Sequence, residues 1–206
     1  MTRIKLCGLT RPCDIAVANE LMSEYIGFVF FPKSRRYVSP EQARALREQL
    51  SPGIKAVGVF VNEAPENIAA LLHQGIIDMA QLHGKETEED IRQLRALTDA
   101  PIIQAFRVDN EQDVTRAEQS SADYLLLDSG SGGTGTTFDW KLIQNIRRPY
   151  FLAGGLNPDN VGKAVEALHP YAVDVSSGIE TDGYKDVTKM RAFVRTVRTG
   201  ERKEAE

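Results

Sequence analysis

The sequence predicts a single (β/α)8 barrel, and three observations predict it. Short apolar runs alternate with amphipathic helical segments along the whole chain, a pattern typical of parallel strands joined by crossover helices. Most of these runs are continuously apolar, as expected for strands that are covered on both faces. Eight strand–helix units in 206 residues give roughly 26 residues per unit, which is enough for one strand and one helix.

The predicted strands are eight apolar segments, at residues 4–7, 25–30, 55–61, 78–83, 101–106, 124–128, 150–155 and 172–177. Alternation alone does not show that a sheet closes, so a doubly wound open sheet is the alternative. Eight complete units in one small chain favour the barrel. No linker or composition shift divides the chain, and we expect one domain over residues 1–198, followed by a charged, frayed tail at 199–206.

The helices between the strands have recognisable ends. Ser39 is a natural N-cap, with proline next and a glutamine that completes a capping box, and Thr87 with Asp90 offers the same arrangement. Pro65 begins a helix that Gly75 is placed to end. We further expect helices that begin near residues 157–158 and 186.

The composition is that of a globular protein that does not bind nucleic acid or enter a membrane. Hydrophobic residues make up 42% and charged residues 26% of the chain. No apolar run approaches the roughly 18 residues that a membrane helix needs, and residues 1–6 are too short and too charged for a signal peptide. A net charge of −4 argues against a phosphate backbone as partner. We therefore expect a cytoplasmic protein.

Chemistry in such a barrel gathers where strands end, and Cys7 and Asp128 stand at such positions. A thiolate is a competent base, and a nearby helix N-terminus would lower the pKa of Cys7; a small buried apolar side chain is the alternative. Asp128 follows four apolar residues, so poor solvation would raise its pKa and suit a general acid; a loop carboxylate or N-cap is the alternative. Cys13 lies within a helical segment and is expected to be inert.

Candidate ligand-binding residues stand at other strand ends. Lys33, Arg35 and Arg36 are close together after the second strand, and arginine suits a carboxylate; a solvated basic loop is the alternative. His83 ends the fourth strand and would border the pocket. The last two strands end in residues whose backbone amides could wrap a phosphate: Gly154, Gly155, Ser176, Ser177 and Gly178.

Two further patterns are weak or missing. Gly130, Gly132 and Gly135 fit a dinucleotide-binding spacing, but the next strand supplies no acid for a ribose hydroxyl. Histidines and carboxylates do not cluster at metal-ligand spacing, so no metal and no cofactor is expected.

Taken together, these motifs resemble the phosphoribosylanthranilate isomerase family. The matching segments run nearly from end to end: KLCGLT (5–10), GFVFFPKSRR (27–36), GVFVN (58–62), QLHG (81–84), LLLDS (125–129), GGTG (132–135), FDW (138–140), LAGGLNPDNV (152–161) and DVSSGIE (174–180). The resemblance implies a (β/α)8 barrel that converts N-(5-phosphoribosyl)anthranilate, by an Amadori rearrangement, into 1-(2-carboxyphenylamino)-1-deoxyribulose 5-phosphate. It implies Asp128 as general acid, Cys7 as general base, Arg36 on the anthranilate carboxylate, and the late glycine-rich loops on the phosphate.

Two other functions are alternatives to this one. An indole-glycerol-phosphate synthase would need a catalytic lysine at a strand end; Lys5 could point inward, but no second lysine–glutamate set accompanies it. A non-catalytic phosphate binder would have no need for Cys7 and Asp128. The partner expected is a small phosphorylated substrate, and the sequence is compatible with either a monomer or a homodimer.

Overall fold

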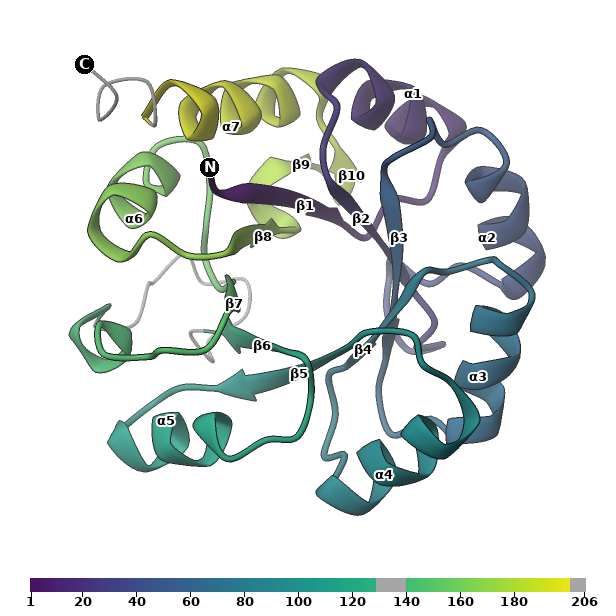
Figure 1. The fold of residues 1–206 in the computed structure, drawn as a ribbon. Helices are drawn as coiled ribbons and strands as arrows, with labels where there is room; N and C mark the ends of the chain where they lie inside the picture. The colour runs from purple at the N-terminus through teal and green to yellow at the C-terminus, as the bar shows by residue number, and fades with distance from the viewer. Residues whose placement is uncertain (129–139, 201–206) are drawn as a thin grey trace.

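The computed structural model describes residues 1–128 and 140–200, and its eight parallel strands close into a barrel (Figure 1). Closure is direct, because the first strand pairs in parallel with the eighth, with Lys5 opposite Asp174. The barrel is therefore confirmed over the open sheet. The strands are β1 (Arg3–Cys7), β2 (Tyr25–Val29), β3 (Lys55–Phe60), β4 (Met79–Leu82), β5 (Ile102–Arg107), β6 (Tyr124–Asp128), β7 (Tyr150–Leu152) and β8 (Ala172–Val175).

Helices form the outer layer, at α1 (Pro12–Leu21), α2 (Pro40–Arg47), α3 (Pro65–His73), α4 (Glu88–Leu97), α5 (Glu111–Glu118), α6 (Val161–Leu168) and α7 (Val187–Gly200). The capping boxes at Ser39 and Thr87 form as predicted. Gly75 follows α3 with a φ of +68°. No helix in the described part of the chain is long and apolar enough to cross a membrane.

The sixth connection, between β6 and β7, differs from the predicted strand–helix repeat. Among the described residues between β6 and β7 there is a 3-10 helix, η1 (Trp140–Ile143), and no α-helix. The predicted start of α6 was also too early. Asn157 instead forms a turn, because its side-chain oxygen accepts hydrogen bonds from the backbone amides of Asp159 and Asn160, and α6 begins at Val161.

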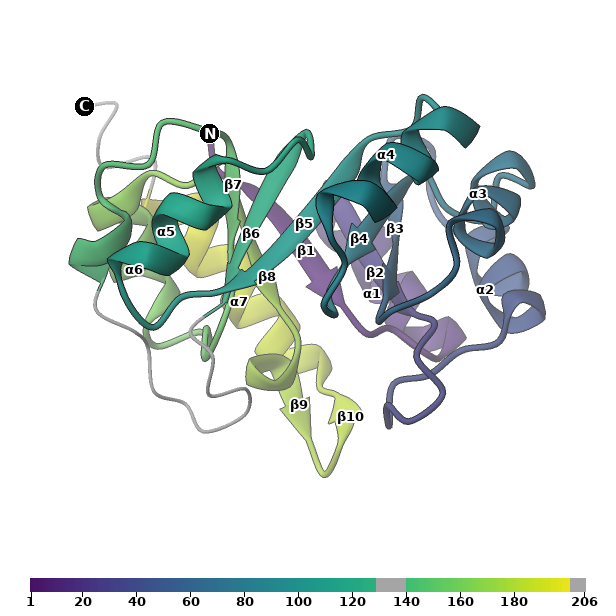
Figure 2. The same cartoon turned by 90° about the horizontal axis from the view of Figure 1, so that it is seen from below.

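The chain after β8 contains a hairpin that was not predicted from the sequence. A 3-10 helix, η2 (Ser177–Ile179), leads into β9 (Glu180–Thr181) and β10 (Tyr184–Lys185). Asp182 and Gly183 join the two strands, both with positive φ, as in the Asp-Gly turns that favour hairpins. The hairpin projects beyond the strand ends, on the side away from the N-terminus (Figure 2). The glycine-rich 130–135 segment lies outside the described residues, as does most of the predicted tail.

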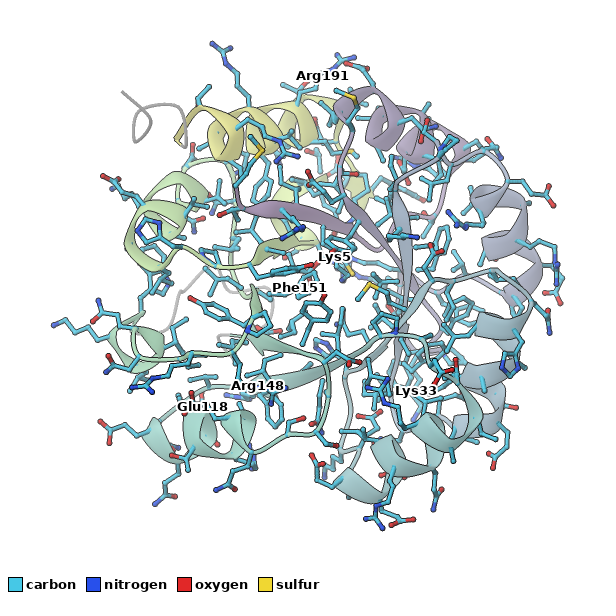
Figure 3. All side chains as sticks on the ribbon, in the orientation of Figure 1. Lys5, Lys33, Glu118, Arg148, Phe151 and Arg191 are labelled. Carbon is cyan, nitrogen blue, oxygen red and sulfur yellow. The ribbon has the colours of Figure 1, made fainter. Side chains whose placement is uncertain are left out.

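The barrel interior is apolar near the N-terminal ends of the strands and polar near their C-terminal ends. Tyr25, Tyr124 and Tyr171 surround Phe151 near the strand starts, with ring centroids 5.3, 5.8 and 5.6 Å from that of Phe151. Their hydroxyls contact one another, at 2.9 Å for Tyr25–Tyr171 and 3.3 Å for Tyr171–Tyr124. Figure 3 shows Phe151 and Lys5 near the centre of the barrel. This aromatic layer fills the end of the barrel where the strands begin.

Candidate functional site

A cavity of about 510 Å³ opens at the C-terminal ends of the strands. The predicted site residues that line it are Cys7, Arg36, His83, Asp128, Gly154, Gly155, Ser176 and Ser177. They come from six different strand ends, and the closed sheet brings them together. A second hollow, of about 610 Å³, lies outside the barrel beside α4 and α5. None of the predicted catalytic or binding residues lines this second hollow. The candidate site is therefore the cavity at the C-terminal ends of the strands, called the barrel mouth below.

Gly178 and Lys33 are the predicted ligand-binding residues that do not line this cavity. A Cβ atom at Gly178 would lie 1.9 Å from the carbonyl oxygen of Leu156. The residue is therefore glycine for a packing reason, namely the close approach of the chain after β8 to the chain after β7. Any contact of its amide with a ligand remains a prediction.

Cys7 ends β1 inside the barrel and is 7% exposed. Gly27 of the neighbouring strand makes room for it, because a Cβ there would lie 2.6 Å from the Cys7 sulfur. Burial raises the pKa of the Cys7 thiol, although Lys5 and Lys185 act in the opposite direction. The prediction of a lowered thiol pKa from a helix N-terminus was therefore wrong. Desolvation of the thiolate outweighs the nearby positive charges.

Lys5, two residues before Cys7 on β1, forms a buried ion pair with Asp174 of β8. The Lys5 ammonium donates to Asp174 Oδ1 at 2.9 Å, with side-chain exposures of 0% and 9%. Burial alone would lower the pKa of Lys5, but the Asp174 carboxylate and Cys7 raise it, so the lysine stays charged. Because side chains two apart on a strand share a face, Lys5 and Cys7 both point inward. The lysine is therefore held by a carboxylate rather than free to act as a nucleophile.

Asp128 is the last residue of β6 and lines the same cavity as Cys7, with His83 beside it. The Oδ2 atom of Asp128 lies 3.8 Å from Nε2 of His83. The amide nitrogen of Gln81 lies 2.8 Å from the other ring nitrogen, Nδ1. Because this amide is a donor, Nδ1 accepts, and the neutral ring carries its proton on Nε2, toward Asp128. A raised pKa for Asp128 remains a prediction.

Arg36 reaches the cavity from the loop after β2, and its guanidinium is paired with Glu180. Nε and Nη2 of Arg36 donate to the two carboxylate oxygens of Glu180 at 2.6 and 2.8 Å. Lys185 also donates to Glu180, at 2.6 Å, and its side chain is 2% exposed. Arg36 and Lys185 together hold the pKa of Glu180 below its usual value, although burial acts to raise it. Arg35 also lines the cavity, whereas Lys33 does not.

Another part of the cavity rim is built from small residues after β7 and β8. Gly154 and Gly155 have φ values of +84° and +65°, a backbone conformation that only glycine adopts readily. Lys185 donates to the carbonyl and hydroxyl oxygens of Ser176 at 3.0 and 3.2 Å, which fixes this rim. Among the described residues, no group of three or more His, Cys, Asp or Glu side chains could hold a metal ion.

Comparison with known proteins identifies the family. A family model described as N-(5'phosphoribosyl)anthranilate (PRA) isomerase matches residues 4–196. The chain belongs to this family. An N-(5'-phosphoribosyl)anthranilate isomerase of Thermoanaerobacter pseudethanolicus is 42% identical over 204 residues, which cover 96% of this chain and 98% of that protein.

Two solved structures of this family are also similar to the chain. The phosphoribosyl anthranilate isomerase of Thermotoga maritima superposes with a TM-score of 0.88 at 40% identity, covering 97% of this chain and 100% of that one. Another, in complex with reduced 1-(o-carboxyphenylamino)-1-deoxyribulose 5-phosphate, has a TM-score of 0.85 at 39% identity, with 97% and 100% coverage.

Four residues at the site were not predicted from the sequence. Gln81 and Asp174 line the cavity, and Glu180 and Lys185 contact its lining residues Arg36 and Ser176. Gln81 and Asp174 carried a usable signal, because each lies two residues from a predicted site residue on one strand and shares its face. Glu180 and Lys185 carried none, since their role depends on a hairpin that folds back against Arg36.

Proposed function

We propose that this chain catalyses the Amadori rearrangement of N-(5'-phosphoribosyl)anthranilate to 1-(o-carboxyphenylamino)-1-deoxyribulose 5-phosphate. The observation that carries the proposal is that Cys7 and Asp128, from strands β1 and β6, line one cavity. Membership of the isomerase family supports the reaction, and a relative binds the reduced product analogue.

The first step opens the ribose ring, with Asp128 as general acid. Its carboxyl group donates a proton to the ring oxygen while the bond between that oxygen and C1′ breaks. The nitrogen lone pair forms a C=N bond to C1′, which gives a protonated Schiff base. His83 lies beside Asp128 with a ring nitrogen turned toward it, a position suited to steadying the carboxylate left after the transfer.

The second step removes the proton from C2′, with Cys7 as general base. The thiolate takes this proton, the C–H electrons form a C1′=C2′ bond, and the Schiff base is neutralised to an enolamine. Tautomerisation moves a proton to C1′ and yields the ketone. Because burial raises the pKa of Cys7, its thiolate is scarce at neutral pH but strongly basic, as a carbon acid requires.

The two charged ends of the substrate would be held on different sides of the cavity. Arg36 would bind the anthranilate carboxylate, since a guanidinium matches a carboxylate fork. The phosphate would lie against Gly154, Gly155, Ser176 and Ser177, with Gly178 behind them. We further propose that the chain acts on this small phosphorylated substrate without a cofactor, in the cytoplasm, as a monomer or a homodimer.

The deciding experiment supplies phosphoribosylanthranilate to the purified protein and follows the loss of its fluorescence. Turnover that scales with protein concentration is expected. A protein that binds the reduced product analogue but does not turn the substrate over would instead be a binding protein that has lost the chemistry.

A further inference from the structure

The guanidinium of Arg36 has more hydrogen-bond capacity than Glu180 uses. A guanidinium has five N–H donors, and Glu180 takes one on Nε and one on Nη2. The ion pair with Glu180 does not use the two hydrogens on Nη1 or the second hydrogen on Nη2. They form the outer edge of the fork, which matches the two oxygens of a second carboxylate. Arg36 can therefore keep Glu180 and bind a ligand carboxylate at the same time.

Three separate contacts fix the direction of that outer edge. Gly8 lies against the aliphatic part of Arg36, since a Cβ on Gly8 would be 2.5 Å from the Arg36 Cδ atom. Glu180 holds the guanidinium from the hairpin side. Lys185 in turn holds Glu180, and all three of its donors are used, on Glu180 and on the two oxygens of Ser176.

Charge distinguishes this arrangement from a simple internal ion pair. Glu180 and Lys185 are almost completely buried, with side-chain exposures of 8% and 2%, whereas Arg36 is 25% exposed and lines the cavity. Lys185 offsets the negative charge of Glu180, so the cluster of Arg36, Glu180 and Lys185 keeps one net positive charge. That charge faces the cavity through Arg36, and a carboxylate approaching it is attracted.

We propose that Glu180 is a positioning residue, which sets the orientation in which Arg36 selects a substrate carrying an aryl carboxylate. Glu180 itself does not line the cavity and acts through Arg36. Lys185 makes this possible, because it balances the charge of Glu180 and ties it to the Ser176 rim. The inference rests on the proposed function, since it concerns the carboxylate end of the same substrate.

The test is Glu180→Gln, which keeps the shape of the side chain but loses the charge and one acceptor oxygen. We expect KM for phosphoribosylanthranilate to rise about tenfold while kcat stays within about threefold. The Kd of the reduced product analogue should rise by a similar factor. The Kd of the corresponding phenylamino analogue, which lacks the carboxylate, should change less than threefold.

Glu20→Gln is the matched control. Arg191 donates to Glu20 through Nε and Nη2 at 3.0 and 2.8 Å, the same geometry as in the Arg36–Glu180 pair. This pair joins α1 to α7 on the surface, and neither residue lines the cavity. We expect the control to leave KM, kcat and both Kd values unchanged.

A double-substitution cycle with Arg36→Met separates positioning from general damage. In the Arg36→Met background, Glu180→Gln should produce no further rise in KM. If Glu180→Gln does not fold, Glu180→Asp takes its place, because it keeps the charge but shortens the side chain that holds Arg36; a rise in KM and in the Kd of the carboxylate analogue is expected, again with little change for the phenylamino analogue.

Several results would overturn the inference. They are an unchanged or lowered Kd for the carboxylate analogue, an equal loss for the phenylamino analogue, a fall in kcat without a rise in KM, or a full effect in the Arg36→Met background. Failure of the proposed function looks different, because the unsubstituted protein would then not turn over phosphoribosylanthranilate at all.

Discussion

Replacing Lys5 by methionine tests the buried charge next to Cys7, the proposed catalytic base. The substitution keeps the length of the side chain but removes the ammonium that Asp174 accepts at 2.9 Å. Asp174 is 9% exposed, so water cannot fully replace the lost partner. Breaking a buried pair by removing one member costs about 3–5 kcal/mol of unfolding free energy. For a chain of this size, that corresponds to a fall in Tm of about 6–20 °C.

A second variant shows whether the unpaired charge is the cause. Adding Asp174→Leu to Lys5→Met removes the stranded carboxylate, and replacing a whole buried pair by apolar residues is often neutral or stabilising. We therefore expect the double variant to recover most of the lost stability in urea unfolding. If the double variant has a lower free energy of unfolding than Lys5→Met, the stranded carboxylate is not the cause, and the reasoning is refuted.

The difference in unfolding free energy between the parent and Lys5→Met should also have a definite pH dependence. The pKa of Lys5 is raised in the folded protein, so the pair's contribution is complete below the unfolded lysine value, about 10.4. It is lost only as the pH rises through the still higher folded value. Urea unfolding at pH 7 and pH 9 should therefore show the same difference between the parent and Lys5→Met. A difference that shrinks markedly by pH 9 would contradict a lysine held charged by Asp174.

Four further substitutions test the roles assigned to residues in and near the site. Cys7→Ala and Asp128→Asn should each lower kcat at least about a hundredfold, the low end for a positioned base or acid, with unchanged circular dichroism; wild-type kcat in Cys7→Ala, with chemistry limiting turnover, would remove the base assignment. Arg36→Met should weaken the carboxylate-bearing product analogue by about 1.5–3 kcal/mol in calorimetric titration and leave inorganic phosphate binding unchanged; the reverse pattern would mean that the substrate lies the other way round. Cys13→Ala should keep kcat/KM within a few-fold, because this thiol is exposed on α1, and a large loss would show that the wrong cysteine was chosen.

The sequence was sufficient where local rules decide the structure. The predicted apolar runs agree with the eight strands to within three residues at every end, because a strand covered on both faces must be apolar throughout. Ser39 and Thr87 capped their helices as predicted, since a capping box is satisfied within four residues. The catalytic candidates also followed locally, because Cys7 and Asp128 had only to end their strands.

The sequence was insufficient where the outcome depends on contacts between distant segments. A helix N-terminus suggested a lowered pKa for Cys7, but the thiol is surrounded by the closed barrel, and that burial cannot be read from residues 5–10. Asp182 and Gly183 did carry a hairpin signal, yet the signal gives no indication that the hairpin carries Glu180 back to Arg36, 144 positions earlier.

The buried charges at the barrel mouth explain how a net negative protein would bind a doubly anionic substrate. The whole chain has a formal charge of −4, so its long-range field does not attract anions. Lys5, Arg36 and Lys185 are paired with only Asp174 and Glu180, which leaves one positive charge among these five groups. The attraction is therefore local and short in range.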